Sequence, residues 1–327
     1  MKIYRNDCMD AYYNLASEQY LLDGNEDNVF MLWRNSDAVI IGKNQNAYAE
    51  LDIEYTKANN IKVVRRLTGG GAVFHDEGNI NFTFIVSGEE NASLDFARFT
   101  RPIIEAISDL GVADVHLSGR NDIMIGDKKV SGNAQSSYNG KTIHHGCILY
   151  SADLSRLSGA LRVDPEKIKA KGIKSVRNRV ANIVDLLDNK MSVTEFMKYI
   201  EDRVAAQTGA EAVEFSHDDK INIRKLADLK YSTWEWNFGK SKEYAAEKKK
   251  RYDFGSVGIC FTVDGGIICK IKIAGDFFGV EDIDRLEETL TGLRFERNAI
   301  EAALDGTLVT RCIAGMDKEA FISLLFS

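Results

Sequence analysis

Three consecutive glycines, Gly69-Gly70-Gly71, follow two arginines in the segment RRLTGGGAVFHD, and this feature constrains the fold of the chain more than any other. Such a run costs conformational entropy on folding, so it is expected where the backbone must approach another group closely. Successive N–H groups of such a turn can cradle an anion. The segment predicts a phosphate or carboxylate site; a glycine bulge beside a structural arginine pair is the alternative.

The standard nucleotide-binding motifs are not found. No G-x-G-x-x-G occurs, and Gly140-Lys141-Thr142 resembles the end of a P-loop only in part, because the earlier glycine of that motif would fall at Gln135. Asn139-Gly140 is therefore interpreted as a hairpin turn.

Two basic segments are candidates for holding an anion. Strand alternation over residues 127–134 would put Lys129 and Ser131 on one face and Lys128 and Val130 on the other. Residues 169–179 contain five cations and no acid, a composition that suits a lid over a polyphosphate. Solvated lysines on an edge strand and a solvated loop are the alternatives.

Composition narrows the class of protein. The chain has 327 residues and a net charge of −7, which favours about two domains and argues against bulk binding to nucleic acid or an anionic membrane. The five cysteines are scattered and form no C-x-x-C pair, so neither a disulfide framework nor a zinc site is indicated. No stretch resembles a signal peptide or a membrane span. These observations predict a cytoplasmic protein.

The hydrophobic pattern predicts an α+β fold, because hairpins outnumber β-helix-β alternations. Residues 10–23 are expected to form a helix that is capped by Asp10 and places Leu15, Gln19 and Leu22 on one face. Further expected elements are strands at 29–33 and 38–42 joined as a hairpin by Asn35-Ser36-Asp37, strands at 62–66 and 80–86, a helix through Ile103, Ile104, Ile107 and Leu110 with Pro102 near its first turn, and hairpins turning at Gly126-Asp127 and Asn139-Gly140.

A charged segment at 240–253 without large aliphatic residues predicts a domain boundary. Two strands around Asp264-Gly265-Gly266 and helices over 281–326 are expected after it.

Taken together, these segments resemble bacterial lipoate–protein ligase A of the biotin/lipoate protein ligase superfamily. The similar segments, in order over about residues 10–240, are NLASEQYLL, VFMLWRNSDAVIIGKNQN, RRLTGGGAVFHDEGNINFTF, GRNDI, KKVSGNAQ, HHGCILYSADLSRLSG, KGIKSVRNRVANI and STWEWNFG. The resemblance implies a large mixed-sheet catalytic domain at 1–243 and a smaller α+β C-terminal domain at 246–327.

The resemblance also implies an ATP-dependent activity. Lipoate would attack the α-phosphorus of ATP, with Mg²⁺ as cofactor, and give lipoyl-AMP and pyrophosphate. A lysine of an apo lipoyl domain would then accept the lipoyl group. The implied acceptors are E2 subunits of 2-oxo-acid dehydrogenases and the glycine cleavage H protein. No nucleic-acid or membrane partner is implied, and a monomer is expected.

Site residues are carried over position by position. Lys129 is the expected catalytic residue, because an ammonium between the carboxylate and the α-phosphate neutralises charge in the transition state. The expected ATP contacts are Arg66, Gly69, Gly70, Gly71, Ala72, Val73, Phe74, Asn121, Lys129, Lys171, Arg177 and Asn182. The expected lipoate contacts are Leu15, Trp33, Arg66, Thr68, His75, Lys129 and His145. Asp122 is the candidate magnesium contact.

Two other functions remain open at this stage. Cys147 lies in the segment HHGC, and some relatives of these ligases are octanoyl- or lipoyl-transferases with a cysteine nucleophile and no need of ATP. A small buried strand residue is the alternative explanation of Cys147. The chain could also bind lipoyl-adenylate without turnover, which Lys129 disfavours.

Overall fold

A computed structural model describes the chain except residues 27, 44, 46, 88–94, 120, 139, 162–178, 240–243, 276 and 278–280. The chain divides into two compact units, Met1–Gln45 with Tyr55–Thr233, and Asn46–Glu54 with Trp234–Ser327. The α+β architecture expected from the sequence is confirmed: a large mixed sheet with helices, and a smaller unit with three antiparallel strands. No helix among the described residues is long and apolar enough to cross a membrane.

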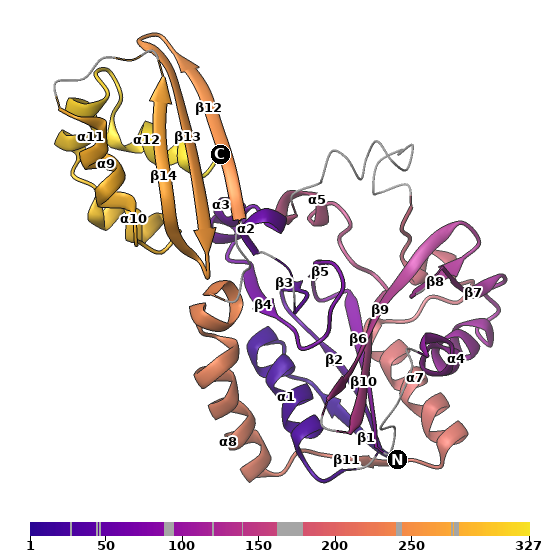
Figure 1. The fold of residues 1–327 in the computed structure, drawn as a ribbon. Coiled ribbons are helices and arrows are strands. Elements are labelled where there is room, and N and C mark those ends of the chain that lie inside the picture. The colour runs from indigo at the N-terminus through magenta and orange to yellow at the C-terminus, as the bar shows by residue number, and fades with distance from the viewer. Residues whose placement is uncertain are drawn as a thin grey trace. The chain divides into compact units, whose positions relative to one another are not determined.

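The larger unit is built on an eight-stranded sheet (Figure 1). Its strands, in spatial order, are β11 (Glu211–Val213), β1 (Lys2–Asn6), β2 (Asn28–Arg34), β6 (Asn79–Ser87), β10 (Lys141–Leu149), β9 (Lys128–Tyr138), β8 (Asp122–Ile125) and β7 (Val115–Ser118). Strand β1 runs parallel to β2 and β11, and the other neighbouring strands are antiparallel.

Helices cover both faces of this sheet (Figure 1). On one face, α4 (Phe96–Ser108) and α7 (Val193–Thr208) pack against a core that includes Phe82 and Ile148. On the other face lies α1 (Ala11–Asp23), flanked by α8 (His217–Leu226) and η3 (Ala227–Tyr231). The unit also contains α3 (Ile53–Ala58) at its boundary, α5 (Leu157–Ala160) and η2 (Ile183–Leu186).

The larger unit also contains a second, three-stranded sheet, and the glycine segment connects two of its strands. Its strands are β4 (Lys62–Arg65), β3 (Ala38–Ile41) and β5 (Val73–His75). The hairpin expected between residues 29–33 and 38–42 is therefore wrong, since β2 and β3 belong to different sheets. Strand β3 pairs with β4 in parallel and with β5 antiparallel, so the segment after Arg34 crosses from one sheet to the other.

Two local predictions also need correction. Pro102 lies inside α4 and not in its first turn, because Asp95 starts the helix earlier by accepting a hydrogen bond from the N–H of Arg98 (3.0 Å). In α1, Glu18 rather than Gln19 is buried, while Asp10 caps the helix as expected through the N–H of Tyr12 (3.0 Å).

The smaller unit contains a three-stranded antiparallel sheet and several helices (Figure 1). Its elements are α2 (Ala47–Glu50), η4 (Glu235–Gly239), β12 (Tyr244–Tyr252), β13 (Gly255–Asp264), β14 (Ile267–Gly275), α9 (Ile283–Leu290), α10 (Arg297–Ala303), α11 (Gly306–Cys312) and α12 (Lys318–Leu325). Within the charged segment 240–253, where the sequence predicts a domain boundary, residues 244–252 form the strand β12. Its lysines occupy an edge of the sheet, where charge discourages edge-to-edge pairing.

Candidate active site

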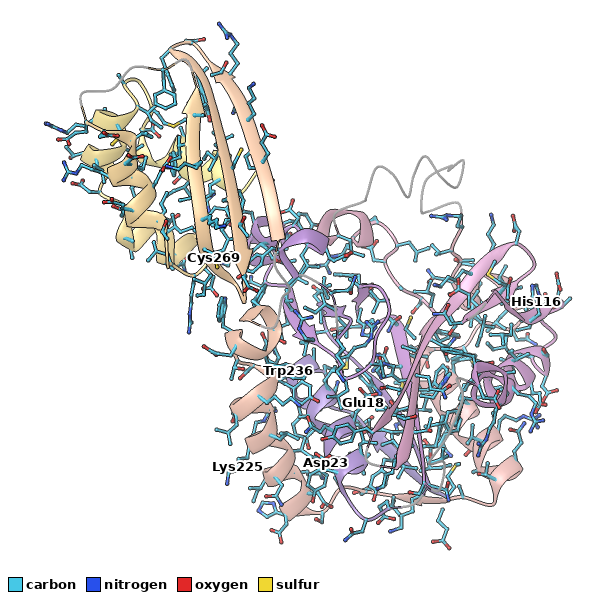
Figure 2. All side chains as sticks on the ribbon, in the orientation of Figure 1. Glu18, Asp23, His116, Lys225, Trp236 and Cys269 are labelled. Atoms are coloured by element: carbon cyan, nitrogen blue, oxygen red, sulfur yellow. The ribbon has the colours of Figure 1, made fainter. Side chains whose placement is uncertain are left out.

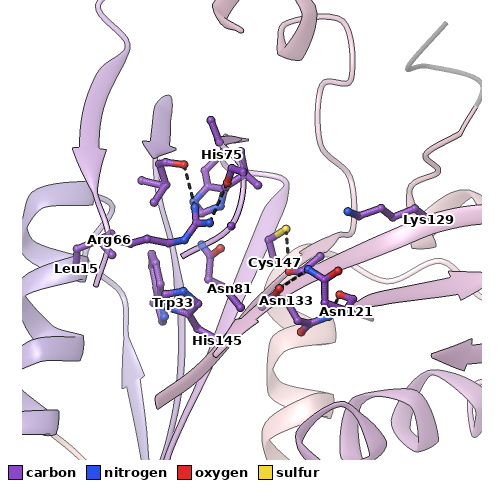
Figure 3. Close-up of a pocket in the computed structure, with 18 residues that line it drawn as sticks. Leu15, Trp33, Arg66, His75, Asn81, Asn121, Lys129, Asn133, His145 and Cys147 are labelled. Atoms are coloured by element: carbon purple, nitrogen blue, oxygen red, sulfur yellow. Dashed lines mark hydrogen bonds between the residues drawn. The ribbon is translucent and has the colours of Figure 1, made fainter. Parts of the chain in front are cut away.

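The larger unit contains a pocket between its two sheets (Figure 3). The lining residues come from α1, β2, β3, β5, β6, β9, β10, the glycine segment and the residue that precedes β8. They are Leu15, Trp33, Ile40, Arg66, Gly70, Gly71, Ala72, Val73, His75, Asn81, Asn121, Lys129, Gly132, Asn133, Ala134, His145, Gly146 and Cys147. Leu15, Trp33 and Ile40 thus contribute apolar wall to the pocket, and Asn121 and Lys129 contribute polar groups from the other side (Figure 3).

The guanidinium of Arg66 organises the glycine segment from within. Its Nη2 donates to the carbonyl oxygens of Gly69 (2.6 Å) and Gly71 (2.9 Å), its Nη1 to that of Ile40 (3.2 Å), and its Nε to Thr68 Oγ1 (3.1 Å). Burial lowers the pKa of Arg66 to about 10, which leaves it charged at neutral pH. Because these bonds use four of the five N–H donors of an arginine, Arg66 chiefly holds the backbone in shape.

The carbonyls of Gly69 and Gly71 face Arg66, so the backbone N–H groups of the glycine segment do not face it. None of the backbone N–H groups of residues 69–72 donates a hydrogen bond to any residue that the structure describes. Gly70 has φ +95° and, like Gly71, is exposed. A row of free N–H groups on an exposed glycine turn is a nest for an anion.

A β-bulge aims Lys129 at the pocket. Ser131 lies opposite Ile123, and Lys129 lies opposite Met124, so Val130 is an extra residue in β9. Ser131 is buried and faces Ile123 and Ile148 of the helix-side core. The expectation that Lys129 and Ser131 share a face is therefore wrong, because a bulge shifts the alternation by one residue.

The ammonium of Lys129 is within reach of a ligand. Lys129 Nζ lies 2.7 Å from Asp122 Oδ1, and both side chains are about one-third exposed. Gly132 makes room for it, since a Cβ there would come within 3.0 Å of Lys129 Nζ. A partly exposed ion pair contributes about 0–1 kcal/mol, so a substrate anion can compete for this ammonium.

A continuous hydrogen-bonded network supports the pocket wall at Trp33 and His145. Trp33 Nε1 donates to Thr83 Oγ1 (3.0 Å), whose hydroxyl donates to Glu18 Oε1 (2.6 Å). His145 bonds the same Glu18 oxygen through Nδ1 (2.8 Å) and Thr68 Oγ1 through Nε2 (2.7 Å). Since Arg66 donates a hydrogen bond to Thr68, this network connects Trp33 to the glycine segment.

Sequence reasoning did not identify Glu18. Its carboxylate is 2% exposed and lies inside the larger unit, whereas His116 and Lys225 lie at the periphery (Figure 2). The signal available was spacing: Glu18 follows Leu15 by three residues and precedes Leu22 by four, so a carboxylate occupies the apolar face of the helix. Such a charge is stable in a core only when it is hydrogen bonded.

Comparison with known proteins identifies the family. Residues 10–205 match the family model for the lipoyl protein ligase A/B catalytic domain, and residues 241–325 match that for the bacterial lipoate protein ligase C-terminus. The chain is 41% identical to lipoate–protein ligase 1 of Staphylococcus aureus over 99% of both chains, and 38% identical to lipoate-protein ligase LplJ of Bacillus subtilis over 97% of both. The chain belongs to the lipoate–protein ligase family.

Solved structures of this family share the fold. A bipartite lipoate protein ligase from Thermoplasma acidophilum, described with its E2 lipoyl domain, has a TM-score of 0.63 and 31% identity, and the match covers 74% of this chain and 97% of that one. A lipoate-protein ligase A bound with ATP has a TM-score of 0.60 and 28% identity, with 73% and 98% covered.

The structure brings most of the residues expected for a lipoate ligase into one pocket. Those that line it are Leu15, Trp33, Arg66, Gly70, Gly71, Ala72, Val73, His75, Asn121, Lys129 and His145. Of the remaining expected residues, Gly69 and Phe74 adjoin lining residues in the sequence, and Asp122 forms an ion pair with Lys129. Thr68 does not line the pocket but is hydrogen bonded to His145, which does.

The expected lid residues have different outcomes. Lys171 and Arg177 lie outside the described residues. Asn182 does not line the pocket, and its side-chain amide bonds both the N–H and the carbonyl of Ala152 (2.9 Å each). Just before Asn182, the N–H of Lys129 donates to the carbonyl of Arg179 (2.7 Å), and the N–H of Ala181 donates to the carbonyl of Lys129 (3.1 Å). The end of the basic segment is thus hydrogen bonded to the strand that carries the candidate catalytic lysine.

Proposed function

We propose that this protein is an ATP-dependent lipoate–protein ligase that activates lipoate as lipoyl-AMP and transfers the lipoyl group to a lysine of an apo lipoyl domain. One observation carries the proposal for this particular site: a lysine ammonium and glycines of a segment with free N–H groups line the same pocket as the apolar side chains of Leu15, Trp33 and Ile40. That arrangement suits an acid with an apolar tail beside a nucleotide phosphate.

In the first step, a carboxylate oxygen of lipoate attacks the α-phosphorus of ATP and pyrophosphate leaves. Lys129 neutralises the two anions as they approach, and the N–H groups of residues 69–72 donate hydrogen bonds to phosphate oxygens. Arg66 keeps that segment in shape. We propose Gly69 to Phe74 and Asn121 as ATP contacts, and Leu15, Trp33, Thr68, His75 and His145 around the acyl chain.

In the second step, the amine of an acceptor lysine attacks the carbonyl carbon of lipoyl-AMP. An amide forms, AMP leaves with the bonding electrons, and the amine nitrogen releases a proton to solvent. Lys129 polarises the acyl-phosphate and stabilises the departing phosphate. No covalent enzyme intermediate is required, since positioning and charge neutralisation supply the rate.

Magnesium fits this site in one way only. Among the described residues, no group of three or more His, Cys, Asp or Glu side chains could hold a metal by itself. Mg²⁺ in nucleotide enzymes is usually held by one or two carboxylates together with substrate phosphates. Asp122, one-third exposed beside Lys129, suits that mode, and bound Mg²⁺ would supply further neutralisation of the phosphates.

We propose E2 subunits of 2-oxo-acid dehydrogenases and the glycine cleavage H protein as acceptors, with the ligase acting as a cytoplasmic monomer. The T. acidophilum relative described with its E2 lipoyl domain supports an acceptor of this class. We further propose residues 1–243 as the catalytic domain and residues 246–327 as an accessory domain.

The direct test combines the protein with lipoate, ATP, Mg²⁺ and an apo lipoyl domain, followed by mass spectrometry of the acceptor. We expect one lipoyl group on the acceptor with ATP and none without it. A matched acceptor with its target lysine replaced by arginine should stay unmodified. No mass increase under any of these conditions would refute the proposal.

The second candidate function is ATP-independent acyl transfer through Cys147, which lines the pocket. A cysteine nucleophile needs a base or a strongly lowered pKa. His145, two residues away on the same strand face, has both ring nitrogens bonded, to Glu18 and Thr68. Its proton-accepting capacity is therefore committed elsewhere.

We expect Cys147→Ala to retain ligase activity within about threefold of wild type, because a small apolar residue replaces another and no acyl-enzyme is formed. Activity is measured as lipoyl transfer with ATP, and intact mass of the enzyme after incubation with octanoyl-acyl carrier protein checks for a thioester. Loss of transfer in the variant together with a thioester on wild type would establish the transferase instead.

A further inference from the structure

Two buried donors in the pocket have no partner in the described chain. His75 is 3% exposed and Asn81 is 2% exposed, and both line the pocket. His75 Nε2 and Asn81 Nδ2 lack any hydrogen-bond partner among the described residues. Since nearly all buried polar groups in native proteins are hydrogen bonded, these two atoms point to a ligand group.

The protonation of His75 follows from its neighbours. Asn14 Nδ2 donates to the carbonyls of Cys8 and Arg34 and to Asn35 Oδ1 (2.8 Å), so Asn35 presents its Nδ2 to His75 Nδ1 (3.1 Å). Nδ1 therefore accepts, and the ring proton lies on Nε2. Burial, with the charge of Arg66, lowers the pKa of His75 to about 3, so a neutral ring offers one N–H to the pocket.

Asn81 is held in place at one end of its amide. Its Oδ1 accepts a hydrogen bond from Asn79 Nδ2 (3.1 Å), which leaves Nδ2 of Asn81 and Oδ1 of Asn79 as the unpaired ends of the two amides among the described residues. Asn81 lies opposite Trp33 on one side and Cys147 on the other (Figure 3). His75 meets the edge of the same Trp33 ring, with ring centroids 6.2 Å apart. Both donors thus lie around Trp33.

The position of Asn81 indicates which part of a substrate it meets. Cross-strand partners run from Trp33 through Asn81 and Cys147 to Gly132, and Lys129 Nζ lies against Gly132. Asn81 is two strand spacings, roughly 10 Å, from Gly132. An acid whose carboxylate is held by Lys129 reaches Asn81 with the far end of its chain.

We propose that Asn81 and His75 bind the sulfur atoms of the dithiolane ring and select lipoate over acids of the same shape that lack sulfur. This inference rests on the proposed function. The discrimination arises because a methylene in place of sulfur leaves both buried donors unpaired. Sulfur is a weak acceptor, so the preference is moderate.

The test compares lipoate with 5-cyclopentylpentanoate, whose five-membered ring has CH₂ groups in place of the two sulfurs. Dissociation constants and kcat/KM for pyrophosphate release are measured for wild type, Asn81→Leu and Ile40→Val. Leu has nearly the shape of Asn without its donors. Ile40→Val is the matched control, because it trims the pocket wall without touching a donor.

We expect wild type to prefer lipoate by on the order of tenfold, and Asn81→Leu to lower this ratio to about twofold, while Ile40→Val leaves the ratio unchanged. Equal dissociation constants and equal kcat/KM for the two acids in wild type would overturn the inference, and this result does not depend on the folding of any variant. An equal fall in kcat/KM for both acids in Asn81→Leu would also overturn it, since the amide would then act on a group that both acids share, such as the carboxylate. Failure of wild type to activate either acid would refute the proposed function itself.

Discussion

Lys129→Ala should lower the rate of pyrophosphate release with lipoate and ATP by on the order of 10²–10³-fold, because the variant removes the positioned charge that the site offers to both anions. The structure gives a specific reason to expect this: a bulge at Val130 turns Lys129 into the pocket, and Gly132 leaves space for its ammonium. The second step, transfer from preformed lipoyl-AMP, should fall in parallel.

The loss should be catalytic and not structural. The ion pair of Lys129 with Asp122 is partly exposed, so its removal should change the free energy of unfolding by less than about 1 kcal/mol. Lys128→Ala is the matched control, since it changes the adjacent lysine of the same strand and should stay within about twofold of wild type. Lys129→Arg should rescue poorly, because a planar fork does not replace a compact ammonium. Near-normal pyrophosphate release by a folded Lys129→Ala would show that another group supplies the charge.

Local sequence signals predicted the elements well wherever contacts are local. The helix at α1, with its Asp10 cap and its end at Gly24, is specified by neighbouring residues, as is the turn after Ile125. The sequence did not reveal which strands pair with one another. Nothing in NVFMLW and AVII tells that one strand joins the large sheet and the other the small one, because strand partners are chosen by distant segments.

The site divides in the same way. The glycine segment and Lys129 could be found because three glycines and a basic strand are unusual in an acidic chain. The face of β9 on which the Lys129 side chain lies could not be predicted, since the bulge depends on how β9 pairs with β8. Glu18, Thr83 and Asn81 were missed for a related reason: each acquires its place in or beside the pocket only where another element supplies its partner or leaves it without one.

Mild acid should destabilise the protein, by on the order of 2 kcal/mol in the free energy of unfolding between pH 6.5 and 5.5. Two histidines supply this effect. Burial lowers the pKa of His75 and of His144 from 6.5 to about 3, and in both cases a nearby charge or histidine adds to the shift. His144 is buried among the rings of Phe82, Phe96 and Phe99.

The sign follows from proton binding. Between about pH 3 and 6.5 the unfolded chain binds one proton at each histidine and the folded chain binds none. The free energy of unfolding therefore falls as the pH falls, by about 1.4 kcal/mol per pH unit for each histidine once the pH is well below 6.5. The stability that these neutral rings contribute is fully present above pH 6.5 and is lost progressively below it.

Replacing His144 should halve this dependence. Denaturant unfolding at pH 7.5, 6.5 and 5.5 would measure the slope for wild type, His144→Phe and His144→Gln. Both variants remove the titrating ring, so both should lose about half of the acid sensitivity. They should differ in absolute stability, since Phe restores the aromatic packing, whereas Gln again buries a polar group whose partners must be found in a core. An unchanged slope in both variants would mean that His144 is protonated in the folded state, and the aromatic enclosure of its ring would then need another explanation.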